Sequence, residues 1–246
     1  MRKSYRELTE EIKTDGERLK LIAALGSSDD LAYHYTLISE DWAAGGTLML
    51  ENSFDRHGEA GIIFLLERLR ALGTASKTDE SAAAGTATDT AYLAAKILSQ
   101  LRHRDFYAAR AKELAALLTA RWEIRDIALR RKQIIALGWI GSESEINLLI
   151  DSMQSDSDAL CRAWAAAALM QLSFHAVDAA FLRERTKTAF AEAIQKEGDL
   201  NAAGIMIEAA QTLFGKKWIS AAAAEAAESE SIEKARKSAL RFLGKA

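Results

Sequence analysis

The sequence of 246 residues contains no proline. Proline interrupts helices and marks loops and sheet edges in most mixed folds, so its absence leaves helices without an interior breaker. Alanine, leucine, glutamate, lysine and arginine dominate instead, and these are the strongest helix formers. No stretch shows the sustained alternation of β-branched and polar residues that a half-buried strand requires. The composition therefore predicts an all-α fold.

Cysteine is almost absent as well. The single cysteine, Cys161, cannot form an internal disulfide, and it lies in an apolar helical stretch. We therefore expect a buried, structural thiol in a reducing compartment. No apolar block has the length of a signal peptide or a membrane span, which favours the cytoplasm and no membrane contact. A chain of this length buries roughly 70–75% of its unfolded surface, so the core needs no disulfide or metal.

The chain also lacks a surplus of positive charge. Lys and Arg total 32 against 35 Asp and Glu, which gives a formal net charge of -3. Modules that bind nucleic acid are usually basic, so this balance argues against nucleic acid as the partner. Two local basic runs, 102–104 and 130–132, would suit an acidic patch on a partner, although such runs are more often simply solvated.

No catalytic or metal-binding constellation is visible. The four histidines are scattered, and we expect each to be a surface or capping residue: His34, His57, His103 and His175. None forms the helical pair that metalloproteases combine with glutamate. Residues 73–78 lack the glycine before lysine and the preceding strand of a phosphate-binding loop. The sequence predicts no catalytic residue, no metal site and no cofactor.

The first 54 residues predict irregular N-terminal helices. Helical spacing runs over residues 5–12 and 18–25, and residues 14–16 separate them, so either two short helices or one kinked helix is expected. A cap at residues 28–30 should precede a helix over 31–38.

Further helices follow before the middle of the chain. We expect Asp41 to start another apolar-rich run that extends to Leu50. Residues 59–72 form a strongly amphipathic pattern that predicts a helix ending at Gly73. The small, polar residues of 73–89 predict a long flexible loop before a helix over 90–101.

The clearest internal repeats lie in residues 105–246. The segment 127–140 aligns with 159–172 after a shift of 32 residues, and its ending Ala-Leu-Gly-Trp-Ile-Gly also resembles residues 239–244. Partner helices are expected between these segments, over residues 145–153, 181–195 and 219–227. A helix pair of this size cannot bury its apolar stripe alone, so neighbouring pairs must stack.

These residues resemble HEAT-like repeats, particularly the short bacterial kind also found in phycobilin lyases. The resemblance rests on an apolar-Arg pair that opens the second helix of each unit, an Ala-Leu-Gly close and an apolar first helix. The residues that carry it are Leu129-Arg130, Ala136-Leu137-Gly138, Ile140-Gly141, Ile146, Leu149-Ile150 and Cys161-Arg162.

The resemblance implies a right-handed α-solenoid of stacked helix pairs, forming one domain over residues 1–246. Second helices would line a concave face that binds partners. The lack of proline departs from the family pattern, in which proline often bends the first helix. We expect Arg130 and Arg162 to hydrogen-bond a neighbouring turn, and the alanines at 165–168 to allow close helix approach.

Projecting the repeat onto second helices leaves a set of large side chains off the core stripe. These predicted partner-binding residues are Arg131, Lys132, Ile135, Trp139, Trp164, Met170, Lys237 and Phe242. Tryptophan and arginine are favoured anchors in interfaces. An equally good alternative is that Trp139 and Trp164 pack between repeats.

The resulting prediction is a non-enzymatic protein-binding module of the cytoplasm. A dedicated inhibitor, such as an immunity protein that occludes a toxin, is one hypothesis for its role. The phycobilin lyase resemblance implies a second possibility, a bilin lyase or chaperone-like protein. A third is nucleic-acid binding or DNA glycosylase activity, since some HEAT-like folds act in that way, and the acidic balance argues against it.

Overall fold

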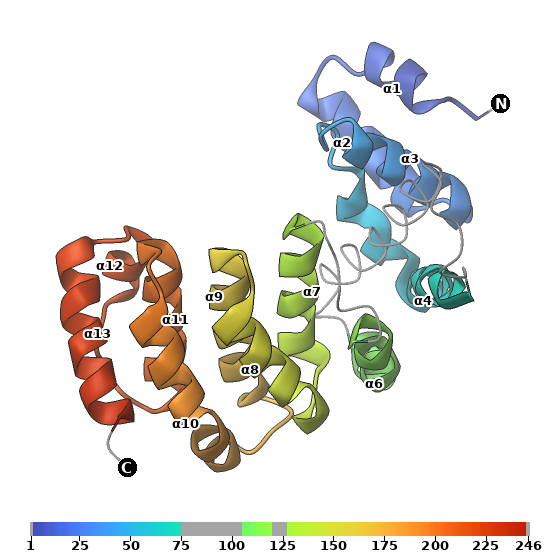
Figure 1. Cartoon of the computed structure of the whole chain (residues 1–246). Coiled ribbons are helices and arrows are strands. Elements are labelled where there is room, and N and C mark those ends of the chain that lie inside the picture. Colours follow the sequence, from blue (N-terminus) through green and yellow to red (C-terminus); the bar gives the residue numbers. More distant parts are fainter. Residues whose placement is uncertain (1, 75–104, 120–126, 245–246) are drawn as a thin grey trace. The chain divides into compact units, whose positions relative to one another are not determined.

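The computed structural model describes residues 2–74, 105–119 and 127–244 (Figure 1). Helices and short 3-10 segments make up its regular structure, and these described residues contain no strand. This confirms the all-α prediction. The predicted helix 90–101 and all but the first two residues of the predicted loop 73–89 lie outside the described residues.

The contacts divide the chain into two compact units, Met1–Tyr107 and Ala108–Ala246. The expectation of a single solenoid domain over residues 1–246 stays a prediction.

The first unit consists of short helices with well-defined N-termini. They are α1 (Tyr5–Glu11), α2 (Asp15–Gly26), α3 (Leu31–Ala43), the 3-10 helix η1 (Leu50–His57) and α4 (Gly58–Thr74). The hydroxyls of Ser4 and Thr14 cap α1 and α2, and a glutamate three residues later completes each capping box. The structure therefore has two short helices in this region and not one kinked helix. Asp30 caps α3, as expected.

Asp41 does not start a helix, so that expectation is wrong. Helix α3 continues through it to Ala43, and the side chain, which is only 1% exposed, accepts hydrogen bonds instead. Its oxygens accept from the backbone N–H of Leu48 at 2.9 Å, that of Leu50 at 3.3 Å and the Tyr5 hydroxyl at 2.9 Å. A buried carboxylate needs such partners, and here they fix the turn from α3 into η1.

The prediction that His34 is a surface or capping residue is also wrong, because its side chain is completely buried. Its Nε2 lies 3.1 Å from the Leu50 carbonyl, which can only accept, so Nε2 carries the hydrogen. Its Nδ1 lies 2.8 Å from His57 Nε2 and therefore accepts from it. The ring also packs on Phe54, with centroids 5.2 Å apart. Burial lowers the pKa of His34 to about 4.

This buried neutral histidine should make the chain less stable in mild acid. Between the folded pKa of about 4 and the unfolded value of about 6.5, the unfolded chain binds the extra proton, so stability falls as the pH decreases. The loss attributable to His34 should be about 2 kcal/mol between pH 7 and pH 5. Urea unfolding at both pH values, compared between the wild type and His34→Gln, measures it.

The exposed Asn201 provides the control for this comparison, because it carries no titrating group. The variant Asn201→Gln should keep the wild-type pH dependence, whereas His34→Gln should flatten it. Equal slopes for His34→Gln and the wild type would contradict the assignment.

The second unit begins within α6 (Asp105–Thr119) and consists of two alternating sets of helices. The second helices of the repeat are α7 (Ile127–Ile140), α9 (Ala159–Leu172), α11 (Leu200–Leu213) and α13 (Ser229–Leu243). The first helices between them are α8 (Ile146–Ser155), which follows η2 (Glu143–Glu145), α10 (Ala179–Lys196) and α12 (Ala221–Glu225).

Successive second helices pack side by side, as Figure 1 shows for the row α7, α9, α11 and α13. Helix α8 packs against α9 and α10, and α10 packs against α11, which forms a second layer. Because α12 has only five residues, α13 also packs directly against α10. This layered stack of helix pairs is an α-solenoid, as predicted.

Helix α11 is the element that sequence reasoning missed. The preceding first helix, α10, has 18 residues where α8 has 10, so a fixed shift of 32 residues no longer finds the next second helix. The segment at 239–244 was matched correctly, because it forms the end of α13.

Helices α7 and α9 approach each other tightly at Gly138. A Cβ added there would lie 2.8 Å from the Ala168 Cα and 3.0 Å from the Ala168 Cβ. Ala165 and Ala166 are completely buried in the same helix. Small residues on both sides therefore let the two backbones meet, as the alanine run predicted.

Replacing Gly138 with alanine should destabilise the chain despite the better helix propensity of alanine. Overpacking against backbone costs about 1–3 kcal/mol, and the propensity gain offsets up to about 1 kcal/mol of that. Urea unfolding should thus show a net loss of about 1–2 kcal/mol. Gly198→Ala is the matched control, since its Cβ would meet nothing within 4 Å, and a Gly138→Ala variant as stable as this control would refute the tight contact.

Candidate protein-binding surface

Five of the predicted binding residues belong to the neighbouring helices α7 and α9. We call this set, Lys132, Ile135, Trp139, Trp164 and Met170, the second-helix face. All five are partly exposed, neither fully accessible nor buried. The structure thus combines the two alternatives for Trp139 and Trp164, because each side chain packs with part of its surface and presents the rest.

The carboxyl end of this face carries an aromatic extension. The His175 ring stacks on Trp139 with centroids 6.3 Å apart and planes within 4°. His175 Nε2 lies 3.0 Å from the Gly138 carbonyl and donates to it. The neighbouring Phe174 is 63% exposed. Sequence reasoning did not assign either residue to the binding surface, because both lie in the turn after α9 and not on a second helix. The sequence feature that could have indicated them is a phenylalanine in a polar turn.

Arg131 belongs to the scaffold rather than to the free surface, which corrects its predicted exposure. Its Nε and Nη2 donate to the two carboxylate oxygens of Asp158 at 2.8 and 2.7 Å. Asp158 Oδ1 also accepts from the backbone N–H of Cys161 at 2.8 Å and so caps α9. The hydrogen bonds from Arg131 hold the pKa of Asp158 well below its usual range. Arg131 therefore joins α7 to the turn before α9.

The two predicted residues on α13 are separate from this face. Lys237 is exposed, whereas Phe242 is half-buried and packs on Phe214 and Trp218, with centroids 6.0 and 5.8 Å apart. Phe242 therefore belongs to an aromatic cluster of the last repeat.

Arg130 and Arg162 make the structural contacts that the sequence predicted. Arg130 donates from Nε and Nη2 to the two oxygens of Asp156, both at 2.8 Å. Arg162 donates to the two oxygens of Glu197 at 2.7 and 2.8 Å, and its Nη1 donates to the Asp156 carbonyl at 2.7 Å. Arg130 therefore links α7 to the turn before α9. Arg162 links α9 to the turn before α11 and also to the turn before α9 itself.

These turns share one pattern, an acidic residue followed two positions later by aspartate. In residues 156–158 and 197–199 the first carboxylate pairs with the arginine of the preceding second helix. The aspartate at the third position caps the following second helix, Asp158 for α9 and Asp199 for α11. In the last repeat Arg236 donates to the carbonyls of Ile194 and Glu197 at 2.7 and 2.8 Å.

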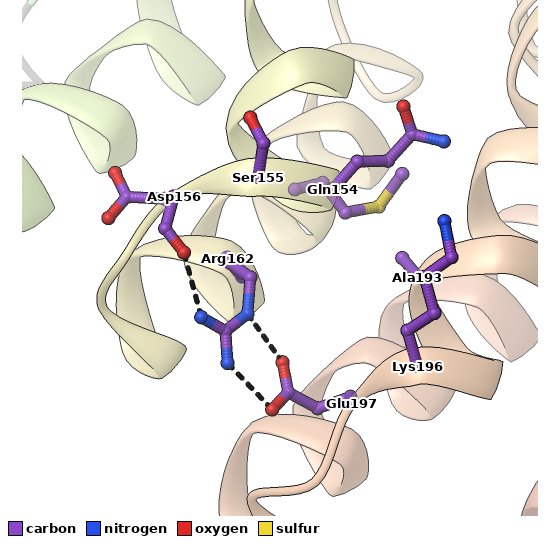
Figure 2. Close-up of a pocket in the computed structure, with 8 residues that line it drawn as sticks. Gln154, Ser155, Asp156, Arg162, Ala193, Lys196 and Glu197 are labelled. Carbon is purple, nitrogen blue, oxygen red and sulfur yellow. Dashed lines mark hydrogen bonds and ion pairs between the residues drawn. The ribbon is translucent and has the colours of Figure 1, made fainter.

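A small hollow of about 280 Å³ lies beside the Arg162 pair. Figure 2 shows Arg162 pointing to Glu197 and to the Asp156 carbonyl, with Lys196 and Gln154 at the rim. Glu197 is 4% exposed, and although burial alone would raise its pKa, the hydrogen bonds from Arg162 lower it below the usual value. The hollow is therefore lined by groups that already satisfy one another, as expected for a seam between repeats.

Cys161 is completely buried, and burial raises its pKa to about 12. The thiol is therefore protonated at neutral pH, in agreement with the predicted structural role. Within residues 2–74, 105–119 and 127–244 no three His, Cys, Asp or Glu side chains are grouped as a metal site would require. None of the described helices combines the length and apolarity needed to cross a membrane.

Residues 80–170 match the family model described as HEAT repeats. This part of the chain is therefore similar to HEAT repeats. The match includes α7, α8 and most of α9, where the arginine pairs lie. Solenoids of this kind commonly serve as protein-interaction modules and are typically not catalytic. No curated protein and no solved structure matches the chain, and the likeness to phycobilin lyases has no support from these comparisons.

Replacing Glu197 with glutamine should destabilise the chain strongly. It leaves the Arg162 guanidinium, which is 22% exposed, without its counter-charge. Breaking a buried ion pair costs about 3–5 kcal/mol, and the partial exposure of Arg162 reduces the expected loss to about 2–3 kcal/mol. Urea unfolding at pH 7 measures the loss.

Acid should abolish the difference in the free energy of unfolding between the wild type and the Glu197→Gln variant. The folded pKa of Glu197 is depressed, so its contribution is present above the unfolded pKa of about 4.3 and is lost as the pH falls through the folded value. Glu192→Gln on the exposed side of α10 is the control and should change stability by less than about 0.5 kcal/mol. If Glu197→Gln and Glu192→Gln lowered stability by similar amounts, the Arg162–Glu197 pair would have no specific effect on stability.

Proposed function

We propose that this chain is a non-enzymatic protein-binding module of the cytoplasm, and that it binds its partner through the second-helix face with the adjoining Phe174. The supporting observation is the row of large apolar side chains that α7 and α9 present only partly buried. Exposed apolar patches of this kind commonly mark interaction sites.

The chemistry of the face suits a protein partner. Tryptophans are the residues most enriched among interface hot spots, and Trp139 and Trp164 lie on neighbouring second helices. Lys132 adds a positive charge at the edge. The helices beneath are fixed by the pairs Arg130–Asp156 and Arg131–Asp158, so the anchors are held in place before binding and less conformational entropy is lost.

The finer part of the proposal is that the partner is a toxin or enzyme that this chain inhibits by covering its active site. A surface whose underlying helices are fixed by the pairs Arg130–Asp156 and Arg131–Asp158 suits occlusion. Inhibitors of this type fill or shield an active site, so they need side chains that anchor the interface and no catalytic residues of their own.

Affinity capture from the source cells tests the binding surface. The tagged wild type should retain a stoichiometric protein, and the variant Trp164→Ala with Phe174→Ser should lose it, because hot-spot truncation costs about 2 kcal/mol or more. The captured protein should then lose its activity when it is mixed with the wild type, as the inhibitor role requires.

Phe181 on α10 provides a matched control, because it is also an exposed phenylalanine, at 43%. The variant Phe181→Ser should retain the partner. A partner lost with Phe181→Ser and kept by the double variant would place the interface on the first helices instead. Absence of any stoichiometric partner would contradict the proposed function.

A further inference from the structure

The last repeat carries a second surface with its own chemistry. Two ammonium groups approach the Phe242 ring, with Lys216 Nζ 4.5 Å and Lys187 Nζ 5.9 Å from its centroid. These side chains come from α13, the turn after α11 and α10. Helices α13 and α10 pack against each other (Figure 1), and the Phe242 ring of α13 contacts Lys187 of α10.

Two more exposed cations are sequence neighbours of this cluster. Lys217 follows Lys216 in the turn, and Arg241 precedes Phe242 on α13. Among the described residues, no ion pair joins Lys216, Lys217 or Arg241 to a carboxylate. We name this surface the terminal basic patch: Lys187, Lys216, Lys217, Arg241, Phe242 and Trp218.

The patch is held rigidly although it includes a turn. The Gln211 side chain accepts from the backbone N–H of Trp218 at 2.8 Å and that of Ile219 at 3.0 Å, and it donates to the Ile219 carbonyl at 3.0 Å. Gly215 adopts a φ of 64°, and the Lys216 N–H donates to the Gln211 carbonyl at 2.7 Å. Lys216 and Trp218 are therefore placed before any ligand arrives.

Beneath the patch the aromatic rings form a continuous series. Phe190 packs on Phe214 with centroids 6.1 Å apart, Phe214 packs on Phe242, and Phe242 packs on Trp218. Phe190 and Phe214 are buried, whereas Phe242 and Trp218 are partly exposed. The surface thus offers positive charge around an apolar centre.

We propose that the terminal basic patch binds an acidic segment of a protein partner, one that combines carboxylates with an apolar side chain. The carboxylates would pair with Lys216, Lys217 and Arg241, and the apolar side chain would pack on Trp218 and Phe242. The proposal rests on charge complementarity and stands separately from the second-helix face. It therefore extends the proposed function to a second contact.

Nucleic acid fits this patch less well. Proteins that bind a phosphate backbone usually spread many cations along a track on a basic domain. Here the cations surround one aromatic centre, Glu184 lies one turn from Lys187, and the whole chain has a net charge of -3. A compact acidic segment matches this distribution better than a duplex.

Fluorescence anisotropy with the full chain tests the proposal. The probe is a labelled peptide of glutamates around one leucine, and the comparison is the same peptide with glutamines. The glutamate peptide should bind, more weakly at higher salt. The variant Lys216→Gln with Lys217→Gln should weaken binding about three- to tenfold, since exposed charge pairs contribute modestly to binding.

Lys112→Gln on α6 is the control, an exposed lysine away from the patch, and it should bind like the wild type. Carbodiimide cross-links from the peptide should map to Lys187, Lys216 and Lys217. Cross-links spread over all exposed lysines, or unchanged affinity in the double variant, would overturn the proposal. So would tighter binding of a DNA duplex that the same double variant abolishes, because the patch would then serve nucleic acid.

Discussion

The arginine–carboxylate pairs at the inter-helix turns are the constraint on which the second unit depends. Apolar contacts between α7, α9 and α11 supply most of the burial, but such contacts tolerate sliding because they have no direction. The two-pronged pairs Arg130–Asp156 and Arg162–Glu197 have a fixed geometry that only one register satisfies. A buried ion pair contributes little net stability compared with apolar packing, so its main effect here is to specify how one repeat meets the next.

Much of this arrangement could be predicted from the sequence. The bounds of α7, the capping residues and the roles of Arg130 and Arg162 follow from local patterns, because helix periodicity, caps and a repeated apolar-Arg pair are encoded within a few residues. The turns of residues 156–158 and 197–199 have the same acid and aspartate spacing, although one uses aspartate and the other glutamate in the first position.

The parts that could not be predicted depend on contacts between distant residues. Nothing near Asp41 shows that its carboxylate accepts from Leu48 and Leu50, and nothing near His34 shows that His57 completes its hydrogen bonds. Projection of the repeat assigned Arg131 to the partner-binding surface, yet it pairs with Asp158 in the same turn that Arg130 binds through Asp156. The α11 helix escaped a fixed-period search because its first-helix partner is longer. Sequence patterns thus give the elements, and long-range polar contacts decide which side chains remain free.

The surface chemistry of α13 has a consequence for how molecules of this chain meet one another. The exposed surface of α13 carries the charged residues Glu233, Lys234, Lys237 and Arg241. A neighbouring molecule that docked there through an apolar helix face would have to strip water from these charges without supplying partners, which is costly. Side-by-side growth into fibres, the hazard of any repeating stack, is thereby opposed by a layer of hydrated ions.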